Sequence, residues 1–302
     1  MAFSATDAAF EGFRVVRRHP MALVFWSLFY IVVMAVAFAV VGNNLIGLTA
    51  AAERLEASGG TPTPDDFMPL LQGYMSVFAV LAPLSLVAGA VLYAAIVRSV
   101  LQPTEKAFGY MRLGMDEVRV LVVSLALMLL FMVGASVAFG IVGALAGFAS
   151  AGGGAVMWIL VVLLALAAVA ACIWLIVRLS LAIPITVAER RFAIFDSFKM
   201  TRGRFWPLLG MALLAGVMSM VVSLLGTLIF LPVEMATGGL EALAALEGQS
   251  LPATIQAAWP AVAGWILVNA VMSALQVAVV YAPFSAAYRD IIGQKPNAEV
   301  FA

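Results

Sequence analysis

Apolar residues are arranged along this chain in long runs that contain no Asp, Glu, Lys, Arg or His. Each run reaches the roughly 20 residues that a helix needs to cross the hydrocarbon core of a bilayer. There are six such runs, at residues 21–41, 68–97, 120–148, 155–177, 205–233 and 261–287. The pattern therefore predicts an all-α polytopic membrane protein with six transmembrane helices.

The polar segments between the runs carry a repeated motif. Phe10, Phe108 and Phe195 begin the sequences FEGFR, FGYMR and FDSFK, in which an apolar residue and then a cation follow the aromatic. On a helix this spacing places an apolar stripe beside a charged edge. Self-similarity at roughly ninety residues is typical of repeat architectures.

The repeat predicts how the chain is organised. We expect one membrane domain over residues 1–302, built from three pseudo-repeated hairpins at about residues 5–102, 103–188 and 189–293. Each hairpin is expected to follow a short amphipathic helix that lies at the cytoplasmic interface.

Composition agrees with this pattern and excludes an ordinary soluble domain. The chain is 65% hydrophobic and 11% charged, whereas charged residues make up about a quarter of a soluble domain. The Ala, Val and Gly usage favours a bacterial protein, and we expect it in the inner (cytoplasmic) membrane.

The distribution of charge predicts the orientation in that membrane. Of the 16 Lys and Arg residues, all except Arg54 lie in segments on one side of the predicted bilayer. Because cytoplasmic segments carry the excess of cations, both termini are expected in the cytoplasm. The opposite side carries two long acidic loops, at residues 42–67 and 234–260.

Residues that usually carry catalysis are scarce. The sequence has one histidine, His19, and one cysteine, Cys172. Without a second histidine or a carboxylate inside the apolar runs, metal hydrolases lack a ligand set and Ser–His hydrolases lack their base. We expect no enzyme activity, no cofactor, no metal site and no nucleic-acid partner.

Neutral polar residues recur at helical spacing inside three of the apolar runs, and the first set is Gln72 with Ser76. The second set is Ser219, Ser223 and Thr227, and the third is Asn269, Ser273 and Gln276. Each set lies along one helix face. Such residues most often form hydrogen bonds between helices, and a polar path for a lipid headgroup is the alternative.

Clustered cations beside aromatic residues are the strongest candidate site. The proposed headgroup ligands are Arg14, Arg17, Arg18, Lys199, Arg202 and Arg204, and the proposed interfacial anchors are Phe10, Phe13, Phe108, Phe195 and Phe198. Arginine binds phosphate through a fork of donors, and each cation near an anionic leaflet contributes about 1 kcal/mol. These residues indicate either an anionic phospholipid site or simple anchors of membrane orientation.

Two segments resemble a known family. The helix at residues 193–204 followed by FWPLL, and the closing sequence YAPFSAAYRD, are similar to the integral membrane domain found fused to glycerophosphodiester phosphodiesterases and to its stand-alone bacterial relatives. The resemblance covers most of the chain and implies a membrane module without the hydrolase barrel. It supplies no catalytic residue for this chain.

Three functions remain open from the sequence. The leading one is a non-enzymatic protein that binds or handles anionic phospholipid or organises the membrane. A second is a subunit or assembly factor of a larger membrane complex, which would dock through the acidic loops. A third is a channel or facilitator for a neutral solute.

Overall fold

The computed structural model describes residues 4–57, 63, 67–104, 107–237 and 259–293, and these contain helices and no strand. The long helices are α3 (Pro20–Ala57), α4 (Met68–Leu101), α5 (Met115–Phe148), α6 (Gly154–Leu179), α9 (Phe205–Thr237) and α12 (Trp259–Ile291). The short elements are α1 (Ala5–Ala9), α2 (Glu11–Arg18), η2 (Ala107–Tyr110), η3 (Ala149–Gly153), α7 (Ala182–Glu189) and α8 (Asp196–Met200).

Five stretches of the described residues are long and apolar enough to cross a membrane. One of them, Phe108–Glu189, has 82 residues and includes both α5 and α6, which turn back on each other at η3. Length and apolar composition thus define an all-helical, multi-pass membrane protein.

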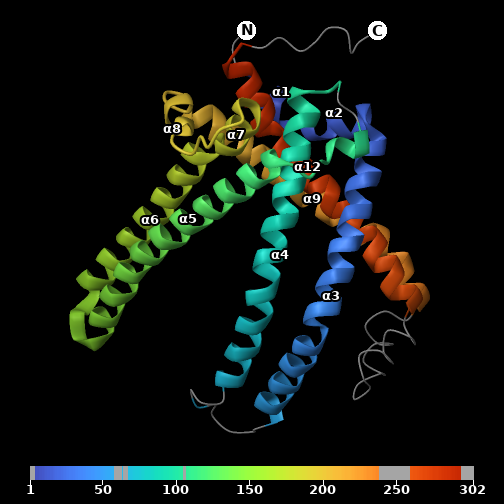
Figure 1. Ribbon diagram of the computed structural model, residues 1–302. Helices are drawn as coiled ribbons and strands as arrows, with labels where there is room; N and C mark the ends of the chain where they lie inside the picture. Colours follow the sequence, from blue (N-terminus) through green and yellow to red (C-terminus); the bar gives the residue numbers. More distant parts are fainter. Residues whose placement is uncertain (1–3, 58–62, 64–66, 105–106, 238–258, 294–302) are drawn as a thin grey trace.

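The long helices pack in pairs. Helices α3 and α4, α5 and α6, and α9 and α12 each form a hairpin, and the hairpins meet at one end and diverge toward the other (Figure 1). The short elements α1, α2, η2, α7 and α8 gather at the shared end. We call this end the basic end, because the described lysines and arginines outside α3 lie there.

Buried residues are concentrated at the basic end. The buried residues of α4 lie between Ala88 and Val100, in its last turns, and those of α5 lie between Glu117 and Val123, in its first turns. Trp26 of α3 is fully buried in the same core. The rest of each hairpin presents many exposed large apolar side chains, as expected for helices whose surfaces face lipid.

Of the short segments, α2 is an amphipathic helix as expected, whereas the second segment is not. Helix α2 has eight residues and α8 has five, whereas residues 107–110 form only a 3₁₀ turn. In that turn Phe108 and Gly109 have left-handed backbone angles, with φ of 48° and 64°. The indole of Trp26 donates to the Gly109 carbonyl over 2.8 Å, and a Cβ at Gly109 would lie 2.9 Å from Cβ of Phe25. The prediction of an interfacial helix is wrong here because η2 is bound closely to α3 instead.

A buried arginine fixes the start of the second hairpin. Arg98, in the last turn of α4, donates from Nη1 to the Tyr110 carbonyl over 3.0 Å and forms an ion pair with Glu117 of α5. Its side chain is 3% exposed and that of Glu117 is 7% exposed. A charge this deeply buried is tolerated only when it is paired.

Arginines in equivalent places contact the other two starting segments. Arg178, at the end of α6, has Nη1 3.4 Å from the Phe198 carbonyl of α8. Arg289, at the end of α12, lies 3.4 Å from the buried carboxylate of Glu11 in α2. We call Arg98, Arg178 and Arg289 the clasp arginines. Arg98 and Arg178 each bind the segment that precedes the next hairpin, and Arg289 binds the segment that precedes the first hairpin.

Most of the second acidic loop and part of the first fall outside the described residues, which omit 58–62, 64–66 and 238–258. Within the described part, α3 continues to Ala57 and α9 to Thr237. Helix therefore extends beyond both predicted apolar runs, and α3 includes the short helix that the sequence predicts at residues 48–57 of the first loop.

Candidate functional site

The cations of α2 are partly neutralised within the protein. Arg14 lies 3.1 Å from Asp7 and 3.4 Å from Glu11, and Arg18 lies 4.0 Å from Glu11. Arg17 is exposed and forms no ion pair with a described residue. Of the three predicted ligands in this helix, Arg17 has the charge that is most available to a headgroup.

The second cluster of predicted ligands is more open. Lys199 of α8 is 84% exposed and lies 3.5 Å from Asp196. Arg202 and Arg204, in the turn between α8 and α9, are exposed and have no carboxylate partner in the described part of the chain. Of these three neighbouring cations only Lys199 has a carboxylate partner among the described residues, which leaves a net positive patch.

Asp196 also ties α8 to the preceding turn. Arg191 Nη1 donates to Asp196 over 2.6 Å, and Arg191 forms a second ion pair with Glu189 at the end of α7. The hydrogen bond from Arg191 holds the pKa of the Asp196 carboxyl below its ordinary value, and Lys199 acts in the same direction. Asp196 is therefore ionised at neutral pH and fixes the orientation of α8.

The predicted aromatic anchors divide into two groups. Phe10, Phe108 and Phe195 are exposed, at 41%, 72% and 72%, and they can enter the interfacial region of a bilayer. Phe13 and Phe198 are partly buried. The Phe198 ring lies edge-on to Trp174 of α6, with 5.8 Å between centroids, so it packs α8 onto the bundle.

Both cation clusters lie at the basic end, on different hairpins. Helix α2 packs against α12 and α3, whereas α8 packs against α6 and α7. In Figure 1, α1 lies between them. The structure therefore separates the six predicted ligands into two sites of three.

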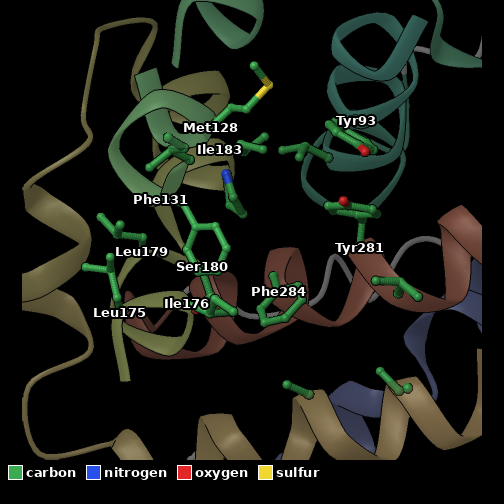
Figure 2. A pocket seen from close by; sticks show the side chains of 17 residues that line it. Tyr93, Met128, Phe131, Leu175, Ile176, Leu179, Ser180, Ile183, Tyr281 and Phe284 are labelled. Carbon is green, nitrogen blue, oxygen red and sulfur yellow. The ribbon is translucent and has the colours of Figure 1, made fainter. Parts of the chain in front are cut away.

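An apolar cavity lies beside the end of α6, the helix on which α8 packs. Its volume is about 510 Å³, and α4, α5, α6, α7, α9 and α12 all contribute to its walls. Figure 2 shows Phe131, Ile176 and Phe284 around its centre, and Tyr93 and Tyr281 on one side. The rings of these tyrosines stack with 4.0 Å between centroids. A cavity of this size and lining suits part of an apolar ligand.

Arg178 connects the cavity to the cations. The next two residues, Leu179 and Ser180, line the cavity, while the Arg178 guanidinium lies 5.5 Å above the Trp174 ring. Its contacts to Phe198 and to the Thr201 hydroxyl are both long, at 3.4 Å. Its Nε is buried without a hydrogen-bond partner. Donor capacity thus remains at the boundary between the apolar cavity and the polar patch.

Neither Arg178 nor the cavity was among the sites predicted from the sequence. A signal for the arginine was present, because it directly ends an apolar run, as Arg98 does. No local signal marked the cavity, since its walls come from six helices and its residues are ordinary apolar ones.

Comparison with known proteins adds no relative. No protein-family model, no curated protein and no solved structure matches this chain. The resemblance to the phosphodiesterase-linked membrane domain therefore stays a prediction, and functional inference rests on the site.

Proposed function

We propose that this protein is a non-enzymatic membrane protein that binds anionic phospholipid. Lys199, Arg202 and Arg204 would contact the phosphate, with Arg178 below them, and an acyl chain would enter the apolar cavity. The observation that carries the proposal is the position of Arg178, which contacts Phe198 and Thr201 beside these cations while the next two residues line the cavity. Anionic headgroups favour clustered cations, and the forked donors of arginine suit phosphate.

We further propose a bacterial inner membrane and six spans in three pseudo-repeated hairpins, with the basic end and both termini in the cytoplasm. The excess of cations at that end supports this orientation under the positive-inside rule. The clasp arginines support the repeat, because all three hairpins use an arginine at the corresponding end of the second helix.

Binding of phosphatidylglycerol in detergent, titrated by native mass spectrometry, tests the headgroup site. Replacing Arg14, Arg17, Arg18, Lys199, Arg202 and Arg204 by Gln should weaken binding while the protein stays folded. Most of the loss should come from Lys199, Arg202 and Arg204, because Arg14 and Arg18 already face carboxylates. The variant Lys199→Gln, Arg202→Gln, Arg204→Gln loses three cations. At about 1 kcal/mol per cation, it should bind phosphatidylglycerol about a hundredfold more weakly than the wild type.

Two controls separate charge from geometry. The variant Arg14→Gln, Arg17→Gln, Arg18→Gln removes equal charge from the other site and should have the smaller effect. Arg202→Lys with Arg204→Lys keeps the charge but removes the forked donors, and should lose only part of the affinity. Unchanged phosphatidylglycerol binding in a folded six-cation variant would overturn the proposal and leave these residues as orientation anchors.

The cavity can be tested from a position that has free space. Gly216 lines the cavity, its helix face is exposed, and a Cβ there would meet nothing within 4 Å. Gly216→Phe should fill part of the cavity and weaken binding of long-chain phosphatidylglycerol more than binding of a short-chain form. Gly210→Phe is the matched control, since Gly210 is also exposed with open space but lies outside the cavity lining. Equal binding of both chain lengths by Gly216→Phe would place the acyl chain elsewhere.

A further inference from the structure

A second hollow lies between α9 and α12 and differs in chemistry from the apolar cavity. Its volume is about 340 Å³. Five of its ten lining residues carry a hydroxyl or an amide: Ser223, Thr227, Asn269, Ser273 and Gln276. We call it the polar groove. Apart from Ser219, the residues of the two polar sets found at helical spacing on α9 and α12 thus converge on one site.

The groove lies within the apolar parts of both helices. Ser223 and Thr227 lie in the second half of α9, and Asn269 to Gln276 lie near the middle of α12. Ser223 and Thr227 are exposed on the side of the bundle. In a bilayer this side faces hydrocarbon, where no water satisfies polar groups.

The hydrogen bonds in the groove stay within single helices. Thr227 Oγ1 donates to the Ser223 carbonyl over 3.3 Å, and Ser273 Oγ donates to Asn269 Oδ1 over 3.2 Å. No described residue accepts from the Asn269 amide nitrogen or the Trp265 indole, and none pairs with the Gln276 side chain. The polar side chains of the groove therefore do not form the expected hydrogen bonds between α9 and α12. Several of their donors and acceptors face an open space.

The size and charge of the groove restrict its ligand. A whole transmembrane helix is about 10–12 Å wide and does not fit into a hollow of this volume. No charged residue lines the groove, and an ionised headgroup would be strongly disfavoured at this depth without a partner. A ligand that arrives sideways through the bilayer must then have an uncharged polar part that both donates and accepts hydrogen bonds.

We infer that the polar groove binds a neutral glycerolipid of the diacylglycerol class. Its free hydroxyl would bond with the Gln276 amide, and its ester carbonyls would accept from the Asn269 amide and the Trp265 indole. The acyl chains would remain in the surrounding lipid. This site is separate from the anionic-lipid site and does not depend on it.

Competition in nanodiscs tests the inference. The probe is a diacylglycerol with a photoreactive acyl chain, added at a few mole per cent to the wild type and to Asn269→Leu with Gln276→Leu. Loss of two hydrogen bonds should reduce crosslinking to α9 and α12 by about tenfold, and unlabelled diacylglycerol should compete in the wild type. Gln72→Leu, which removes an exposed amide from α4, is the matched control and should crosslink as the wild type does.

Two further measurements keep the outcomes distinct. Ser223→Phe fills the groove from an exposed position and should block crosslinking even if the double variant folds poorly. Phosphatidylglycerol binding at the basic end should be unchanged in every groove variant, so failure of one site is separable from failure of the other. Equal crosslinking in wild type and Ser223→Phe would overturn the inference. A wild-type dimer that Ser223→Phe dissociates, with no crosslinked lipid, would also overturn it by assigning the groove to a second copy of the chain.

Discussion

Asp196 limits the positive charge of the α8 cluster. It pairs with both Lys199 and Arg191, so removing its charge frees cations without creating new ones. Asp196→Asn should therefore strengthen binding to phosphatidylglycerol vesicles, by about fivefold for one additional cation near an anionic surface. Vesicle co-sedimentation at low and high salt measures the change, which should shrink as salt screens the charges.

Acidification provides an independent check on the same carboxylate. The pKa of Asp196 is lowered by the hydrogen bond from Arg191. Its ion pairs are therefore complete above the ordinary carboxyl pKa of about 4 and are lost as pH falls through the lowered value. Asp196 stays ionised between pH 7 and pH 5, so its titration should not change vesicle binding in this range. Weaker vesicle binding by Asp196→Asn at neutral pH would show that the carboxylate orients α8 more than it limits charge.

Sequence reasoning succeeded at single residues where the property is local. Arg17, Arg202 and Phe195 lie in polar segments beside apolar runs, and all three side chains are exposed in the structure. The burial of Glu11 could not be foreseen in this way. Its partner Arg289 comes from the opposite end of the chain, and nothing in the local sequence distinguishes this carboxylate from the exposed Asp7.

At the scale of the element, the clasp arginines decide how the hairpins join. Arg98→Leu would leave Glu117 buried without its cation, and loss of one partner of a buried pair destabilises by about 3–5 kcal/mol. Thermal unfolding in detergent should show a clearly lower midpoint. The matched control is Arg119→Gln, because Arg119 pairs with Asp116 at 2.7 Å and is 24% exposed, so its loss should cost at most about 1 kcal/mol. Equal unfolding midpoints for Arg98→Leu and Arg119→Gln would contradict the structural role proposed for this clasp arginine.

The long helices could be predicted from the sequence, whereas the short segments could not. A run of apolar residues fixes a spanning helix through its own length, since every backbone group must bond internally in lipid. Residues 108–112 have the same pattern of aromatic and cation as the FEGFR motif of α2, yet residues 107–110 form a left-handed 3₁₀ turn. The contact that decides this is the bond from Trp26 to Gly109, across 83 positions of sequence.

Helix packing at α2 shows the same dependence on distant contacts. Gly12 crosses α12 so closely that a Cβ would lie 2.5 Å from the Val279 Cα. The FEGFR motif explains an amphipathic helix but not why a glycine stands at its centre. The reason lies in α12, where the backbone at Ala278 and Val279 occupies the space of a side chain.

At the scale of the whole molecule, the composition predicted a multi-pass membrane protein. It did not predict the apolar cavity or the polar groove. Hydropathy is a sum over residues that are neighbours in the sequence, so it identifies a membrane protein without knowledge of the fold. The apolar cavity needs side chains from six helices and the polar groove from two. For the polar groove, helical spacing identified the right residues, but only the packing of α9 on α12 joins them into one site.

The divergence of the hairpins away from the basic end has a mechanical consequence. A protein whose helices meet at one end and spread toward the other occupies unequal areas in the two leaflets (Figure 1). Lipid must fill the intervals between hairpins in the wider leaflet, while the narrower end displaces less lipid. A wedge-shaped protein fits best where the bilayer itself is bent, so we expect its density in the membrane to rise with membrane curvature.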